Sequence, residues 1–158
     1  MTPYEKLLEV ALNEGVTVID YDLGEKIRGL YCDGYILIEK HAGTEERYCT
    51  LAEELGHHFT AASNIVETDS IDKCKQEQLG RRWGFENILP VQKIIDAIIN
   101  GCDTLYAIAE QLEVTPEYLQ DALKYYSQKY GPEISYGDYV VVFSNESLIV
   151  HPILDDII

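Results

Sequence analysis

Basic residues are scarce in this sequence of 158 residues. Lys and Arg number 12 against 28 Asp and Glu, so the formal net charge at pH 7 is −16. Because nucleic acids are polyanions that proteins bind through Lys and Arg, a nucleic-acid partner is electrostatically disfavoured. Long hydrophobic runs are missing as well, since no stretch approaches the roughly 18 apolar residues typical of a membrane-spanning helix. We therefore expect no direct contact with nucleic acid or membrane.

Signals of export and of stable disulfides are also absent. The first five residues, MTPYE, lack the basic start and the apolar run of a secretory signal. The cysteines Cys32, Cys49, Cys74 and Cys102 are spread singly, without a CxxC pair that would indicate a disulfide framework or a zinc knuckle. We expect a cytoplasmic protein with reduced thiols that act mainly as small buried hydrophobic residues.

The hydrophobic pattern predicts an α+β protein in three segments. Hydrophobic residues make up 46% of the chain, which is enough for a compact unit with a core. Residues 1–90 are expected to hold an N-terminal helix, a small antiparallel sheet and two more helices. Residues 91–130 are expected to form three short helices, and residues 131–158 a β-hairpin packed on the same unit.

Capping and turn residues mark the ends of these elements. Thr2 followed by Glu5 is a capping box with Pro3 at the first helical position, and Asp33-Gly34 between two extended runs is typical of a tight hairpin. The expected helices span residues 3–13, 45–59, 73–88, 91 to the stop at 100–101, 104–112 and 116–126, with Thr44, Asp72, Asp103 and Thr115 as caps. The expected strands span residues 16–20, 26–32, 35–38, 139–143 and 147–150, and a polar loop opens at residues 61–64.

The last two expected helices have the short turn of a helix-turn-helix, a motif common in DNA-binding proteins. The second of them carries Glu117 and Asp121 in the turns that would face bases, and no arginine. A helix that reads DNA needs basic contacts to phosphates, so we interpret the pair as ordinary helical packing. A DNA-binding regulator is the third hypothesis for function, and the net charge opposes it.

The most informative stretch is TLAEELGHHFT, residues 50–60, within a predicted helix. Residues four apart on a helix project side by side, so Glu53 and His57 can bind one ion, with Glu54 about 100° further round. The HExxH helix of zinc peptidases has this arrangement, and there the residue after the first ligand is the general base for the bound water. Glu53 replaces the first histidine. Glu77 on the next helix can supply a third ligand, which is the layout of gluzincin-type metallopeptidases.

Three stretches together resemble the ImmA/IrrE family of metallopeptidases, which occur in phages, integrative elements and bacterial genomes. They are AEELGHH at residues 52–58, QE at 76–77 with RRW at 81–83, and IAEQLEVT at 108–115. The resemblance covers roughly residues 7–130. It implies a zincin-like minimal metallopeptidase core followed by a helical segment, with the terminal hairpin outside the resemblance.

The resemblance also implies an activity and a partner. Family members are cytosolic metal-dependent endopeptidases, often encoded beside a helix-turn-helix repressor that they cleave or engage. The implied substrate is therefore a protein, a basic helix-turn-helix repressor. By position, Glu54 matches the general base that activates a metal-bound water. His57 and Glu77 match metal ligands, and Glu53 stands where the more usual members have histidine.

The Glu53 replacement leaves alternatives open. Two carboxylates and one imidazole suit zinc, and they also suit manganese or ferrous iron. A site that no longer holds metal would leave a catalytically degenerate module that engages a repressor without hydrolysis. A competing frame uses Glu54 and His58 as ligands and would leave Glu54 unable to act as base. One of Arg81 and Arg82, which follow Glu77 on the same helix, could steady a tetrahedral oxyanion, or both could simply form ion pairs with acidic residues. His41 has no partner pattern and is expected at the surface.

Overall fold

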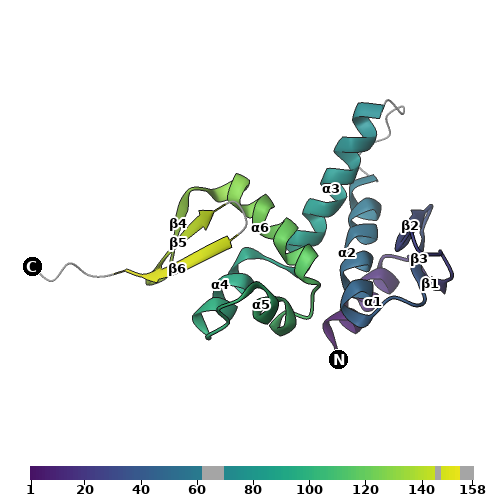
Figure 1. The fold of residues 1–158 in the computed structure, drawn as a ribbon. Helices are drawn as coiled ribbons and strands as arrows, with labels where there is room; N and C mark the ends of the chain where they lie inside the picture. The colour runs from purple at the N-terminus through teal and green to yellow at the C-terminus, as the bar shows by residue number, and fades with distance from the viewer. Residues whose placement is uncertain (62–69, 145–146, 154–158) are drawn as a thin grey trace, which may run out of the picture. The chain divides into compact units, whose positions relative to one another are not determined.

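The computed structural model describes residues 1–61, 70–144 and 147–153. The chain divides into two compact units, Met1–Ile88 and Leu89–Ile158, which are described separately below. The fold is α+β, as predicted, with helices and two three-stranded sheets in the described residues (Figure 1). Most of the polar loop expected at residues 61–64 lies outside the described residues.

In its described residues, the first unit contains three helices and one sheet. Its elements are α1 (Pro3–Asn13), β1 (Thr17–Tyr21), β2 (Gly29–Cys32), β3 (Tyr35–Glu39), α2 (Thr44–Ala61) and α3 (Ser70–Ile88). The capping box of α1 is confirmed, because the Thr2 side chain accepts the Glu5 N–H and the Glu5 carboxylate accepts the Thr2 N–H. The expected cap Asp72 is wrong, since α3 begins two residues earlier, at Ser70.

The sheet of the first unit has the strand order β1-β3-β2 and is mixed. β2 and β3 form the predicted hairpin, and Asp33 and Gly34 have the positive φ values, 44° and 83°, that a type I′ turn requires. β1 pairs with β3 in the parallel direction, whereas we expected an antiparallel sheet. The residue pattern locates strands, but it does not say which neighbour a strand joins after a connection as long as residues 22–28.

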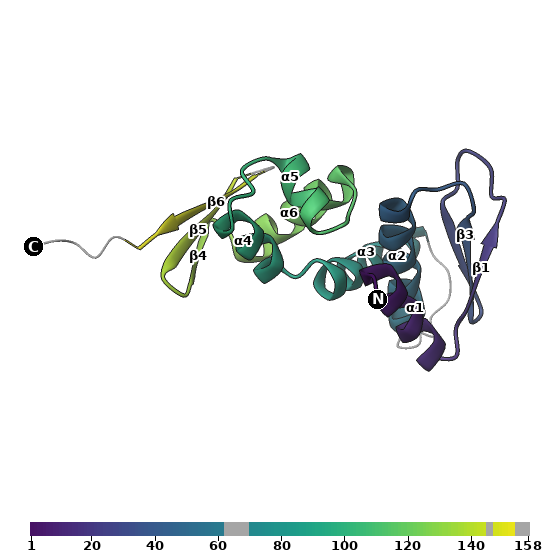
Figure 2. The ribbon, with the colours of Figure 1, turned by 90° about the horizontal axis from the view of Figure 1, so that it is seen from below.

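One face of this sheet is covered by α1 and α2 (Figure 2). The core between them contains fully buried aliphatic side chains: Ala11, Ile36, Ile38, Leu51, Ala52 and Leu55. All four cysteines are free thiols. Cys49 is buried as expected, but the expectation is wrong for Cys32 and Cys74, which are exposed.

The part of the second unit that the structure describes contains three helices and an antiparallel sheet. Its elements are α4 (Val91–Ile99), α5 (Leu105–Gln111), α6 (Pro116–Tyr130), β4 (Glu133–Tyr136), β5 (Tyr139–Ser144) and β6 (Ser147–Pro152). β5 and β6 are the predicted hairpin, and β4 adds a third strand on β5 that the sequence interpretation missed. Thr104 caps α5, because its side chain accepts the Ala107 N–H, so the expected cap Asp103 is wrong by one residue.

The helix-turn-helix-like pair is packed into the core of the second unit. α6 buries one continuous face, made of Tyr118, Leu119, Ala122, Leu123 and Tyr126. The hydroxyl of Tyr126 donates to the carbonyl of Leu89, which ties α6 to the start of the unit. Throughout the described residues, each helix is too short or too polar to cross a bilayer.

Candidate metal centre

Two helices, α2 and α3, carry the side chains predicted for the metal site. α2 places Glu53 and His57 one turn apart, and α3, which lies alongside α2 (Figure 1), carries Glu77. Gly56 and Gly80 meet between the two helices, since a Cβ added to Gly56 would clash with the Gly80 carbonyl. The lack of both side chains lets the backbones approach closely enough for His57 to reach the neighbouring helix.

His57 bridges the two helices. Its Nε2 lies 3.3 Å from Oε2 of Glu77. The imidazole ring lies against Gly80, where a Cβ would come within 2.7 Å of Nδ1. Because Gly80 has no side chain, the ring of His57 has room to reach Glu77.

A hollow of about 410 Å³ opens beside this pair. Its walls come from α2, α3 and the edge strand β2. The lining residues are Gly29, Leu30, Tyr31, Glu54, His57, Thr60, Gln76 and Glu77. The structure thus brings three of the four predicted site residues, Glu54, His57 and Glu77, to one space at the edge of the sheet.

Glu54 occupies an unusual environment for a carboxyl group. Burial, and after it the neighbouring carboxylates of Glu53 and Glu77, raise the pKa of Glu54 to about 7, while the nearby backbone N–H of Tyr31 acts in the opposite direction. Gly29 lies directly against the side chain, since a Cβ there would be 3.0 Å from Cγ of Glu54. A carboxyl group whose pKa lies near neutral pH is suited to accept and release a proton.

Glu53, the fourth predicted site residue, is engaged elsewhere. Its Oε1 lies 3.2 Å from Nε of Arg81, which forms an ion pair between α2 and α3. Burial raises the pKa of Glu53, and Arg81 partly offsets that rise. Of the two roles considered for Arg81 from the sequence, the structure displays the ion pair.

The donor chemistry suits a divalent cation, although the side chains do not surround one point. Burial is the main cause of the raised pKa values of Glu53 and Glu54; repulsion by neighbouring carboxylates adds to it, and a bound cation would relieve that repulsion. The ligand atoms of Glu53, His57 and Glu77 do not all lie within 4.8 Å of one another. Arg81 would compete with such an ion for the Glu53 carboxylate.

His58, the ligand of the competing frame, has two other partners. Its Nδ1 lies 3.0 Å from the hydroxyl oxygen of Tyr31, and its Nε2 lies 3.7 Å from Oε2 of Glu14. A site built from Glu54 and His58 would have to break both contacts. The geometry therefore favours His57 as the histidine of the site.

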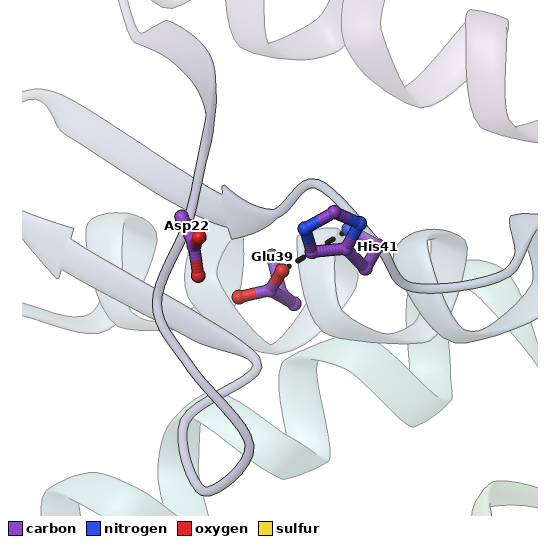
Figure 3. Close-up of side chains that lie close together, drawn as sticks. All are labelled: Asp22, Glu39 and His41. Carbon is purple, nitrogen blue, oxygen red and sulfur yellow. Dashed lines mark hydrogen bonds between the residues drawn. The ribbon is translucent and has the colours of Figure 1, made fainter.

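A second group of ligand-type side chains lies where β1 and β3 end (Figure 3). One ligand atom each from Asp22, Glu39 and His41 lies within 4.8 Å of the others, the one such group of three in the described ranges. The buried Glu39 carboxylate already accepts hydrogen bonds from the N–H groups of Leu23, at 2.6 Å, and His41, at 3.1 Å. These donors account for its charge without a cation.

Sequence reasoning missed this second group. His41 is exposed, as expected, and its neighbour Glu39 attracted no attention because it ends a hydrophobic run. Parallel strands place their carboxyl ends at the same edge of a sheet. The missing signal was therefore the parallel pairing of β1 with β3, from which the proximity of Asp22 to Glu39 follows.

The fold and the donor set define a small metallopeptidase-like protein. The family model for the IrrE N-terminal-like domain, peptidase family M78, matches residues 3–124. The chain belongs to this family, as its resemblance to the ImmA/IrrE family predicted. No curated protein matches the chain. Membership of this family implies a metallopeptidase-type function and a bound metal.

Proposed function

We propose that the protein is a metal-dependent endopeptidase in which Glu54 is the general base and Glu53, His57 and Glu77 hold the metal. One observation carries the proposal: Glu54 lines the same hollow as His57 and Glu77. A general base must lie beside the metal ligands, and Glu54 meets this condition.

The residues of the chain divide the chemistry between them. A divalent metal, when bound, supplies a Lewis acid that polarises the peptide carbonyl and lowers the pKa of water. Glu54 takes a proton from the attacking water and delivers it to the amine that leaves when the C–N bond breaks, which regenerates the base. Zinc is the metal we propose, and the carboxylate-rich donor set also accommodates manganese or ferrous iron.

The proposed substrate is a basic regulatory protein of the cytoplasm, a helix-turn-helix repressor. A net charge of −16 attracts a basic protein over a distance and repels nucleic acid. Within the helix-turn-helix-like pair, Glu117 and Asp121 remain exposed on α6, which supports contact with a basic protein rather than with DNA.

Cleavage of a purified basic helix-turn-helix repressor by the zinc-loaded protein, followed by mass spectrometry, tests this function. We expect Glu54→Gln to slow cleavage by at least about 10²-fold, because the amide cannot accept the proton, while the zinc content stays the same. The matched control is Glu45→Gln, which removes an exposed carboxylate from the first turn of the same helix.

Elemental analysis supplies the outcomes that would contradict the proposal. Less than about a tenth of an equivalent of metal under saturating zinc or manganese would exclude a metallopeptidase. Loss of metal from Glu54→Gln would instead make Glu54 a ligand and leave the site without its base.

The ion pair between Glu53 and Arg81 favours one second candidate, a protein that engages a repressor without hydrolysis. In that case the unaltered protein and Glu54→Gln would bind the repressor equally, and neither would cleave it. Binding followed by size-exclusion chromatography, alongside the cleavage assay, separates the two functions.

A further inference from the structure

The sheet of the first unit has a second face, opposite the one that α1 and α2 cover. Ile36 and Ile38 of β3 are buried under the helices, and side chains of alternate residues in a strand point the opposite way. The strand register aligns these outward side chains in two rows, with Tyr21 beyond them at the end of β1. The rows are Thr17, Tyr35 and Cys32, and Ile19, Leu37 and Leu30. We call these seven side chains the outer face.

The outer face is hydrophobic and open to solvent. Ile19, Leu30 and Tyr35 are 39%, 47% and 54% exposed. All of the side chains except Thr17 are hydrophobic, and none is charged, although 25% of the residues of the chain are charged. A sheet face that meets only water usually carries polar residues, and contiguous apolar patches on a protein surface mark sites of interaction. The outer face therefore has the composition of a binding surface.

The outer face adjoins the hollow of the candidate metal centre. Leu30 belongs to both surfaces, because it lines the hollow and stands opposite Leu37 in the strand register. β2 is an edge strand of the sheet and is also a wall of the hollow. A protein bound on the outer face thus has its neighbouring segments beside the hollow.

The charge of the chain determines which kind of partner fits this surface. The net charge of −16 attracts a basic protein over a distance. A second copy of the chain brings the same negative charge and is repelled. The apolar composition of the outer face and the acidity of the chain together favour a basic partner with an apolar patch of its own.

We propose that the outer face is a docking surface for the basic protein substrate, which binds it through apolar side chains bordered by Lys and Arg. The outer face holds the substrate, and the hollow acts on one of its peptide bonds. This inference deepens the proposed function and rests on it for the catalytic consequence alone. Contacts away from the reacting bond hold a substrate in the orientation that the reaction needs.

Binding of a synthetic peptide to the metal-free protein tests the docking surface without catalysis. The probe is a fluorescein-labelled amphipathic helix with Leu on one face and Lys on the other, and anisotropy measures its Kd. We expect Ile19→Thr/Tyr35→Thr to bind the probe at least about tenfold more weakly than the unaltered protein, because central apolar contacts dominate such interfaces. Threonine retains the preference for extended structure at both positions.

Ile149→Thr is the matched control. It removes a hydrophobic side chain that is 46% exposed on β6, in the second unit, and it should leave the Kd unchanged. Thermal unfolding establishes that each variant is folded before it is compared. If the double variant does not fold, Tyr35→Thr alone is measured, with an expected loss of at least about threefold.

Three outcomes of these measurements would overturn the proposal. Equal affinity for the probe in the unaltered protein and the Ile19/Tyr35 variant would show that the outer face does not bind it. Equal affinity for a second peptide with Glu in place of Lys would show that the partner need not be basic. Sedimentation that reveals a dimer of the unaltered protein and a monomer of the variant would assign the outer face to a second copy of the chain.

Kinetics on a purified basic helix-turn-helix repressor connect docking to cleavage. We expect Ile19→Thr/Tyr35→Thr to raise KM by about tenfold with kcat nearly unchanged, because docking contacts bind the ground state and the transition state equally. A short peptide that spans the cleaved bond should be cleaved equally by both proteins. A lower kcat with KM unchanged would overturn the docking role. If the unaltered protein cleaves nothing, the proposed function fails, and the peptide Kd values still decide whether the outer face binds.

Discussion

At the scale of single residues, the charges of the candidate centre are arranged around Arg81. Its guanidinium faces the Glu53 carboxylate. A divalent metal bound by Glu53 would take the place of this guanidinium. The Arg81 side chain is 44% exposed, so the ion pair is partly solvated and its contribution is modest. In the metal-free protein, Arg81 therefore competes with the metal for the proposed ligand Glu53.

We expect Arg81→Gln to bind zinc more tightly, because Glu53 then has no ion-pair partner to leave. The expected gain is roughly tenfold, in keeping with the partial exposure of the pair. Titration of the metal-free protein against a competing chelator measures it. Arg82→Gln removes the same charge one residue further along α3 and controls for net charge. An affinity that is equal or weaker in Arg81→Gln would show that Arg81 supports the site instead of competing for it.

Glu39 is one residue whose titration bears on stability. Backbone N–H donors, first that of His41 and then that of Leu23, hold the pKa of this buried carboxyl below its ordinary value of 4.5. A depressed pKa in the folded state means that the stabilisation is present above that ordinary value and is lost as the pH falls through the folded-state pKa.

We accordingly expect Glu39→Gln to lower the urea midpoint at pH 7, since an amide cannot accept both N–H groups as a carboxylate does. The difference from the unaltered protein should shrink as the pH falls below 4.5, where the unaltered carboxylate also becomes protonated. Urea titrations of both proteins at pH 7 and at a pH below 4.5 measure this difference. A difference that stays constant with pH would show that charge has no part in the effect.

At the scale of elements, the approach of α2 to α3 is set by two glycines with different neighbours. Gly56 faces the backbone carbonyl of Gly80, which cannot move without moving α3. Gly80 faces the ring of His57, which can turn about its side-chain bonds. The two positions should therefore respond differently to the same added methyl group.

We expect Gly56→Ala to reduce the free energy of unfolding by about 1–3 kcal/mol, as overpacking between rigid segments does. Gly80→Ala should cost less stability but weaken zinc binding, because the displaced ring no longer reaches Glu77. Gly43→Ala is the control, since its Cβ would meet one atom at 4.0 Å. Denaturant unfolding and zinc titration of the three variants measure both effects. Equal zinc affinity in Gly80→Ala and Gly43→Ala would contradict the role given to Gly80.

The same elements show what sequence can and cannot predict. α1 was predictable to the residue because its signals are local: Thr2, Pro3 and Glu5 act on one another within one turn. The Asp33-Gly34 hairpin was predictable for the same reason. The parallel pairing of β1 and the addition of β4 to the second sheet were not predictable. Both depend on contacts between segments that are distant in the sequence, and a local pattern contains no information about such contacts.

The candidate site divides in the same way. Glu53, Glu54 and His57 could be found from their spacing on one helix, and Glu77 from its place on the next. The engagement of Glu53 by Arg81 and of His58 by Tyr31 could not, because each joins residues about 28 positions apart through side-chain geometry alone. The spacing predicts the donors, and the fold decides which of them face one another.

At the scale of the whole molecule, a metal in the first unit should leave a measurable mark on stability. Trp83, the one tryptophan of the chain, stacks on Phe59 with 4.7 Å between ring centroids and so reports on the α2–α3 pair. A ligand that binds the folded state alone, at about 100 times its Kd, stabilises that state by about 2.7 kcal/mol.

We expect zinc to raise the thermal midpoint of the Trp83 fluorescence transition by roughly 5–10 °C, and a chelator to reverse the rise. Glu77→Gln, which removes one of the proposed ligands, should abolish most of the shift. A shift of equal size in Glu77→Gln would place the metal at another group, such as that of Asp22, Glu39 and His41.

The close approach of β2 to the Glu54 side chain has a consequence for self-association. Exposed N–H and C=O groups on an edge strand are a template for pairing with another chain, and proteins blunt such edges with charge or short length. β2 has four residues, and the Glu54 carboxylate stands against it, since a Cβ on Gly29 would lie 3.0 Å from Oε1 of Glu54. The base of the proposed peptidase site thus also shields this edge against strand-to-strand aggregation.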